Sequence, residues 1–189
     1  MQQSFIRVLI INESRDQYIG MVNVLRSVMS VDYELTWCAD YKHALEALLS
    51  PLHDIILLDF EHNSAICHDL LRAAAGHDCN IPIICLTSEI DEQLDGAVIK
   101  AGAADYLMKS EMSSESLERA IRYAIDRKHS EIELARLAHY DLLTGIPNRA
   151  LFNDRLDRAL QRAQRGDAPF SLLYVDLGGF KAINGIYGH

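Results

Sequence analysis

The stretch VLIINES, residues 8–14, is an apolar run that ends on the polar residues Asn12 and Glu13. It reads as a buried strand, and open α/β sheets carry their functional groups at the carboxyl ends of such strands. Four more strand-like runs follow, at 33–38, 54–60, 82–87 and 104–110. Apolar residues at helical spacing separate them, at 16–29, 41–49, 64–75 and 90–101. Five β-α steps predict an α/β fold with a five-stranded, parallel, doubly wound sheet.

Composition limits the function classes. The 189 residues suffice for one domain and part of a second. A net charge of −9 argues against sequence-independent binding to nucleic acid or to anionic membranes. No apolar run approaches the roughly 20 residues that span a bilayer, and the N-terminus lacks a signal-peptide layout. We therefore expect a cytoplasmic protein that binds neither nucleic acid nor membrane.

A change of character at Ser113 marks the domain organisation. Residues 114–140 are charged, free of Gly and Pro, and carry an apolar stripe, which predicts a helix that continues the last helix of the first domain. This helical linker has two readings of equal weight, a short coiled coil between two copies or a solvated spacer. We expect a first domain at 1–125, the linker at 114–140 and the start of a second domain at 141–189.

The second segment opens with a break at DLLTGIP, residues 141–147. An amphipathic helix is predicted from about Asn148 to Arg165. The run FSLLYVDLGGF, residues 170–180, is predicted to be a strand that ends in Asp176 and two glycines.

The strand ends of the first domain deliver a set of polar groups to one edge. They are Asn12 and Glu13, then Asp59, then Thr87, then Lys109. Carboxylates can hold Mg²⁺, and a carboxylate can attack phosphorus when cations neutralise the transferring group. This edge is therefore predicted to support an aspartyl phosphate at Asp59.

These runs resemble response-regulator receiver domains of two-component systems, through VLII-NE, DIILLD, PIICLT and GAADYLMK. The resemblance implies a flavodoxin-like fold, Asp59 as phosphoacceptor, Thr87 as switch hydroxyl, Lys109 as phosphate-binding lysine and Tyr106 as switch aromatic. It also implies a Mg²⁺ site, for which we expect Asp59, Glu13, Asn12 and the backbone carbonyl of Glu61.

The departures from the receiver pattern are informative. The family usually ends its first strand with two acids, whereas this chain has Asn12 and the longer Glu13. One carboxylate is lost, so weaker Mg²⁺ binding is expected. Ser110 also stands where Pro is common. These changes motivate an alternative, a pseudo-receiver that is never phosphorylated and acts as a dimerisation or docking module for the degenerate domain that follows it.

Residues 139–189 resemble the opening of a GGDEF domain, the α+β diguanylate cyclase fold that makes cyclic di-GMP from GTP. The motifs are YDLLTGIPNRALF and LLYVDLGGFKAINGIYGH. The resemblance implies metal binding by Asp176 and nucleotide binding by Asn184 and Lys181. Gly178 and Gly185 stand where Asp is common, and the GGDEF loop itself is absent. We expect no cyclase activity from this fragment, and GTP binding only in a longer parent. The run GIPNRALFNDRLDRALQRA, residues 145–163, resembles composite proteins in which a phosphodiesterase domain follows.

Together these features predict a response regulator of phosphorelay signal transduction. A sensor histidine kinase or a phosphotransfer protein would phosphorylate Asp59. The phosphorylated chain would then control a cyclic di-GMP-related GGDEF output through a homodimer.

Overall fold

The computed structural model describes residues 5–28, 31–48, 50–59, 64–77, 79–88, 92–166, 169–176, 178–179 and 185. The chain divides into two compact units, Met1–Leu134 and Ala135–His189.

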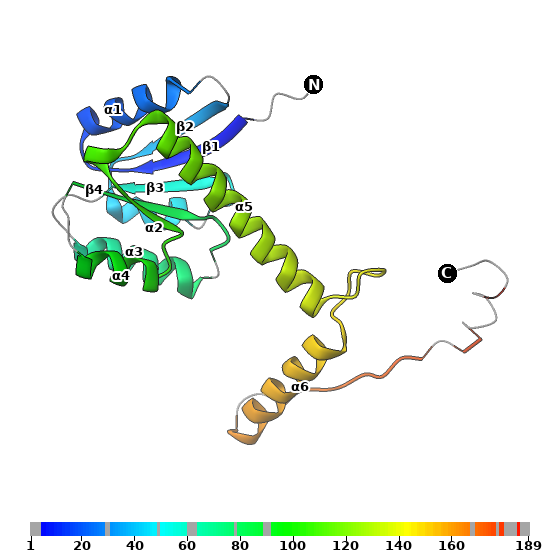
Figure 1. The fold of residues 1–189 in the computed structure, drawn as a ribbon. Helices are drawn as coiled ribbons and strands as arrows, with labels where there is room; N and C mark the ends of the chain where they lie inside the picture. The colour runs from blue at the N-terminus through cyan, green and yellow to red at the C-terminus, as the bar shows by residue number, and fades with distance from the viewer. Residues whose placement is uncertain are drawn as a thin grey trace. The chain divides into compact units, whose positions relative to one another are not determined.

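The first unit is built on a parallel sheet of five strands (Figure 1). In spatial order they run β2-β1-β3-β4-β5. Their bounds are β1 Phe5–Ile11, β2 Asp32–Cys38, β3 Ile55–Asp59, β4 Ile83–Thr87 and β5 Asp105–Met108. All five residues of β3 and of β4 are buried, as expected for central strands covered on both faces. The predicted α/β fold is confirmed.

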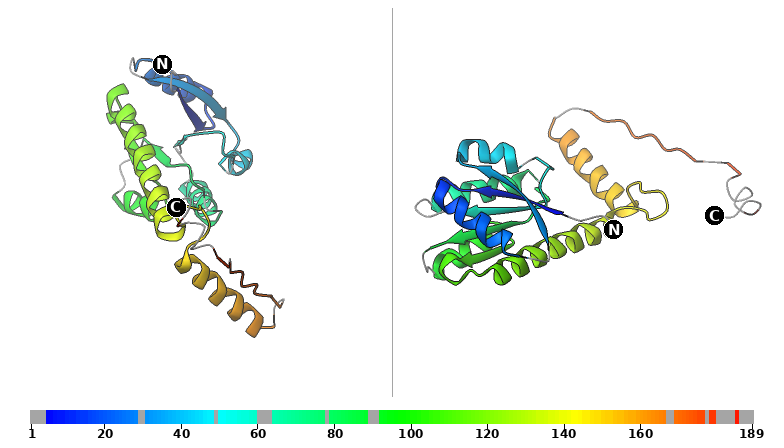
Figure 2. Two further views of the ribbon diagram at one scale, coloured as in Figure 1. Left: turned by 90° about the vertical axis from the view of Figure 1, so that its right-hand side faces the viewer. Right: turned by 90° about the horizontal axis from the view of Figure 1, so that it is seen from above.

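Helices cover both faces of this sheet. One face packs against α2 (Tyr41–Leu48), α3 (Ser64–Gly76) and α4 (Glu92–Lys100), through buried residues such as Ala44, Leu71 and Val98. The other face packs against α1 (Arg15–Arg26) and the first half of α5 (Ser114–His139). Both views of Figure 2 show this half of α5 running along one side of the sheet. The alternation of side chains along each strand supplies both cores.

The linker residues form one continuous helix, α5, preceded by a short 3₁₀ turn at Lys109–Glu111. Its first half is anchored by the buried residues Leu117, Ala120, Ile121 and Ala124. Further along, Leu134 and Leu137 are exposed. Among the residues that the structure describes, no helix is both long and apolar enough to cross a membrane.

The second unit contains α6 (Arg149–Gln164) and a turn that precedes it. The prediction of a strand within 170–180 is wrong. Residues 171–176 form no regular secondary structure and are exposed. A strand needs a neighbour to receive its backbone hydrogen bonds. The described residues of this unit contain no strand that could be that neighbour.

Candidate functional site

The register of the sheet brings the polar strand ends together. Ile11 lies opposite Leu58, so the residues that follow them, Asn12 and Asp59, are neighbours. Thr87 pairs with Met108, so Lys109 begins just beyond the end of β4. Asn12, Asp59 and Thr87 are buried, with exposed fractions of 2%, 2% and 3%. Three polar residues are therefore buried together at one edge of an otherwise apolar sheet.

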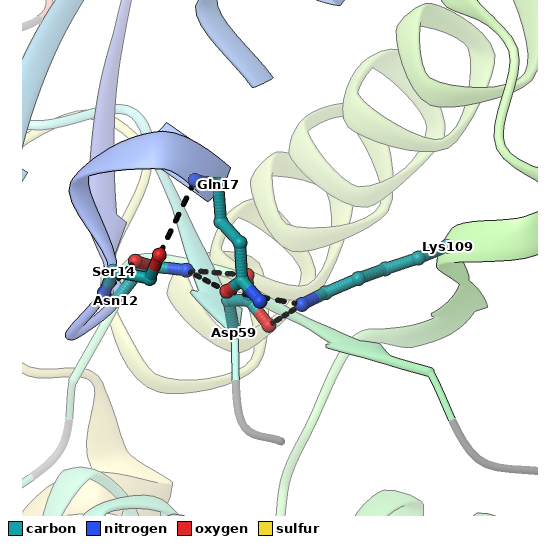
Figure 3. Close-up of polar contacts among 5 residues, drawn as sticks. All are labelled: Asn12, Ser14, Gln17, Asp59 and Lys109. Carbon is teal, nitrogen blue, oxygen red and sulfur yellow. Dashed lines mark hydrogen bonds and ion pairs between the residues drawn. The ribbon is translucent and has the colours of Figure 1, made fainter. Parts of the chain in front are cut away.

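Asp59 and Lys109 form the charged centre of the site (Figure 3). Lys109 Nζ lies 2.5 Å from Asp59 Oδ1, and their side chains are 17% and 1% exposed. A carboxylate buried this completely requires a compensating cation, and Lys109, which follows β5 at the same edge of the sheet, supplies it. The pair is formally neutral, so it adds no net charge to the interior.

Asn12 contacts the second oxygen of Asp59. Its side-chain Nδ2 donates to Asp59 Oδ2 at 2.6 Å and to Gln17 Oε1 at 2.7 Å. Its Oδ1 accepts the backbone N–H of Ser14 at 2.6 Å. A reversed amide would place oxygen against two acceptors and NH₂ against a donor, so this network fixes the orientation of the amide. Asn12 therefore acts on Asp59 as a hydrogen-bond donor.

The other predicted residues take different places. Glu13 is exposed, and Tyr106 is half-buried, where it packs against the core on the α2, α3 and α4 face. Asp176 is exposed in the second unit. Glu61, Lys181 and Asn184 lie outside the described residues. The roles assigned to all of these residues stay predictions.

Gln17 and Trp37 were not anticipated from the sequence. Gln17 Oε1 also lies 3.4 Å from Lys109 Nζ, so it contacts both residues that hold Asp59. Trp37 Nε1 donates to the backbone carbonyl of Asn12 at 3.0 Å, and its ring stacks on Tyr18 with centroids 5.0 Å apart. The spacing Ser14-x-x-Gln17 at a helix start was the available signal for Gln17, since it is a capping-box pattern.

The arrangement can be tested for its fit to Mg²⁺. Mg²⁺ needs oxygen lone pairs in near-octahedral geometry, and an amide N–H supplies none. Asn12 turns its N–H toward Asp59, and its oxygen is engaged by Ser14. Within the described ranges, no group of three His, Cys, Asp or Glu side chains could hold a metal ion. As arranged, these side chains do not form a magnesium site.

The second unit has a well-defined turn at its start. Thr144 donates to Asp141 Oδ1 through its backbone N–H at 2.9 Å and its hydroxyl at 2.7 Å, and these bonds hold the pKa of Asp141 below its usual value. Gly145 has a φ of 69°, which favours glycine. Asn148 caps α6 by accepting from Leu151 N at 3.1 Å and donates to the carbonyl of Ala138 at 2.8 Å. This part of the motif therefore has a structural role.

The first unit matches a known family of domains. The sequence model of the response regulator receiver domain matches residues 8–122, which is more than half of the chain. The chain belongs to the receiver family. The model of the diguanylate cyclase GGDEF domain matches residues 138–189, so the receiver is followed by part of a GGDEF domain.

Two relatives of this receiver chain come from Pseudomonas aeruginosa. One is a bifunctional diguanylate cyclase/cyclic di-GMP phosphodiesterase, MucR, 54% identical over 57 residues, or 30% of this chain and 8% of that protein. The other is the diguanylate cyclase TpbB, 30% identical over 120 residues, or 64% of this chain and 28% of that protein. The chain thus spans less than a third of the length of either relative.

Solved structures agree with the receiver fold. The receiver domain of a modulated diguanylate cyclase from Desulfovibrio desulfuricans G20 is 25% identical with a TM-score of 0.56, covering 68% of this chain and 99% of that one. The receiver domain of the sensor histidine kinase PA1611 from Pseudomonas aeruginosa is 22% identical with a TM-score of 0.55, covering 65% and 99%. That structure carries a magnesium ion in its active-site cleft.

Proposed function

We propose that this receiver accepts a phosphoryl group on Asp59 and thereby controls the GGDEF segment that follows it. The observation that supports this most directly is the ion pair between Asp59 Oδ1 and Lys109 Nζ at 2.5 Å, at the carboxyl edge of the sheet. A buried, ionised carboxylate is a suitable nucleophile toward phosphorus. The adjacent ammonium can pair with the oxygens of the transferring group.

The chemistry is a transfer in which one bond forms and one breaks. An oxygen of Asp59 forms a bond to phosphorus, while the bond from phosphorus to the donor breaks and the donor leaves with the electron pair. Lys109 pairs with a phosphoryl oxygen, and the hydroxyl of Thr87, buried at the neighbouring strand end, donates to another. Mg²⁺ binding through Asp59, Glu13, Asn12 and the carbonyl of Glu61 stays a prediction.

The same proposal covers organisation and partners. The receiver comprises residues 1–125, the helical linker 114–140 and the start of the output domain 141–189. A sensor histidine kinase or phosphotransfer protein supplies the phosphoryl group in the cytoplasm. Phosphorylation changes how two copies pair, which brings their cyclic di-GMP-related output domains together or apart. The longer parent protein would be the one that uses GTP.

The test is the intact mass of the purified chain after incubation with acetyl phosphate or phosphoramidate and Mg²⁺. We expect one added phosphoryl group, and none on Asp59→Asn. The matched control is Asp69→Asn, which removes an exposed carboxylate on α3 and should leave the adduct unchanged. An adduct that persists in Asp59→Asn, or no adduct with either donor, would contradict the proposal.

A second candidate function is a pseudo-receiver that acts as a dimerisation or docking module. The hydrogen bond from Asn12 Nδ2 to Asp59 Oδ2 at 2.6 Å favours it, because that oxygen already has a partner. A protein of this class would show no adduct with any donor and would keep the same oligomeric state in Asp59→Asn. Sedimentation of both proteins with and without phosphodonor separates the two functions.

A further inference from the structure

The start of α1 carries an unusual cap. In a capping box the Gln at the third helical position turns back to the backbone N–H of the cap residue. Here Gln17 donates its own N–H to Ser14 Oγ at 3.5 Å, as that motif requires. The N–H of Ser14, however, is taken by Asn12 Oδ1 at 2.6 Å. The side chain of Gln17 is therefore released from the cap and is available to the site.

The side chain of Gln17 contacts Asn12 and Lys109, two residues that contact Asp59. Its Oε1 accepts from Asn12 Nδ2 at 2.7 Å and lies 3.4 Å from Lys109 Nζ (Figure 3). Asn12 Nδ2 has two hydrogens, of which one points to Asp59 and the other to Gln17. Gln17 therefore holds the amide of Asn12 in the orientation that directs N–H, and not oxygen, toward the carboxylate.

This orientation opposes a divalent cation. A metal ion beside Asp59 Oδ2 would face the NH₂ end of Asn12, which repels it. To offer its oxygen, the amide must turn and give up its contacts with Ser14, Asp59 and Gln17. Ser14 makes its contact through the backbone, so the contact with Gln17 is the one that a substitution can remove without changing Asn12 or Asp59.

We propose that Gln17 is a positioning residue that holds the Asn12 amide in the place of a metal ligand at Asp59, and so lowers the affinity of the site for Mg²⁺. Trp37 binds the backbone carbonyl of Asn12 and leaves the amide free to turn, so it does not share this role. The inference concerns metal affinity alone and holds whether or not Asp59 accepts a phosphoryl group.

The test is a Mg²⁺ titration of the whole chain, followed by calorimetry and by the fluorescence of Trp37, the single tryptophan. Gln17→Met keeps the length of the side chain and its helix propensity but removes the acceptor. We expect it to bind Mg²⁺ roughly three- to tenfold more tightly than wild type, the range that one lost hydrogen bond supports. Gln161→Met, the same change at an exposed position of α6, should bind as wild type does.

A second background separates this role from a general effect of Gln17. Asn12→Asp replaces the amide by a carboxylate, which has no N–H to be held. In that background we expect Gln17→Met to give no tightening. Equal tightening in both backgrounds would overturn the proposal. So would a Gln17→Met protein that binds Mg²⁺ no better than wild type, or binds it unmeasurably. Far-UV circular dichroism establishes that each variant is folded.

This result is distinguishable from the outcome of the phosphorylation test. Tighter Mg²⁺ binding by Gln17→Met, together with no adduct on the wild-type chain, supports the inference and contradicts the proposed function. An adduct on the wild-type chain, together with unchanged Mg²⁺ affinity in Gln17→Met, supports the proposed function and contradicts the inference.

Discussion

At the scale of single residues, the buried carboxylate of Asp59 depends on two donors of different kinds. Lys109 supplies charge to Oδ1, and Asn12 supplies a neutral N–H to Oδ2. Burying an ion costs several kcal/mol unless a partner compensates it, and the ammonium provides most of that compensation. The stability of the folded receiver should therefore be sensitive to Lys109.

We expect Lys109→Met to lower the free energy of unfolding by about 3 kcal/mol, because it leaves a buried carboxylate without its cation. Asp59 keeps its hydrogen bond from Asn12, which places the cost at the low end for a broken buried pair. Urea denaturation at pH 7 measures the effect.

The double variant Lys109→Met/Asp59→Asn is the control for this prediction. It removes both charges, so most of the lost stability should return. If the two substitutions instead add their costs, the destabilisation comes from lost packing of the lysine stem and not from an uncompensated charge.

The sequence predicts which residues lie at this edge of the sheet better than it predicts the hydrogen bonds between them. Asn12, Asp59, Thr87 and Lys109 were assigned to one edge because parallel strands share the direction of their carboxyl ends. The sequence does not predict that the Asn12 amide turns its N–H, and not its oxygen, toward Asp59. It depends on Ser14 and Gln17, whose contacts of 2.6 and 2.7 Å exist only once α1 has formed beside β1.

At the scale of the elements, β1 and β3 are tied together at the edge opposite the site. Asp54 accepts from the backbone N–H of Arg7 at 2.9 Å and from its guanidinium at 2.7 and 3.1 Å, and Asp54 N donates to Arg7 O at 2.8 Å. The bonds from Arg7 hold the pKa of Asp54 below its usual value. This cluster therefore makes a pH-dependent contribution to the pairing of the two strands.

We expect Asp54→Asn to be less stable than wild type at pH 7. A carboxyl whose pKa is lowered by folding adds stability above its unfolded pKa of 3.8, and this stability is lost as the pH falls through the folded value. The difference between the two proteins should therefore shrink as the pH drops below 3.8. The side chains of Arg7 and Asp54 are 38% and 35% exposed, so added salt should also reduce the difference in stability between the two proteins. Urea midpoints across pH 2–7 measure it.

Asp69→Asn, which removes an exposed carboxylate of α3, is again the matched control, and its urea midpoint at pH 7 should equal that of wild type. A difference between Asp54→Asn and wild type that stays constant down to pH 2 would mean that the shape of the side chain matters and its charge does not.

An apolar run predicts a strand reliably only where neighbouring strands are present to pair with it. β3 and β4 were predicted from their apolar residues, and each finds a strand on both sides. The run at 170–175 is also mostly apolar, yet its residues are exposed. Strand propensity reflects packing against neighbouring strands, and no described strand is available to pair with this run.

At the scale of the whole chain, the two units differ in their cores. The described residues with buried apolar side chains all lie between Val8 and Ala124. In the unit from Ala135 to His189, no described residue is buried, and Leu143, Leu173 and Tyr174 are more than 80% exposed. Burial of apolar area is the main favourable term in folding, so the stability measured for the chain should come from the first unit.

We therefore expect a chain ending at Leu134 to unfold with the same urea midpoint and the same slope as the 189-residue chain. A chain ending at His139, which keeps α5 whole, is the control for the cut within that helix. The isolated segment 135–189 should show no cooperative transition, because none of its described residues has a buried side chain whose burial could offset the conformational entropy lost on folding.

Two results would contradict this division of stability. A lower midpoint for both truncated chains would mean that residues beyond 139 stabilise the receiver. A cooperative transition in the isolated segment 135–189 would mean that it buries a core of its own. In either case the exposed apolar residues at 142–175 would have partners in solution, and hydrogen exchange of their backbone amides in the full chain would locate them.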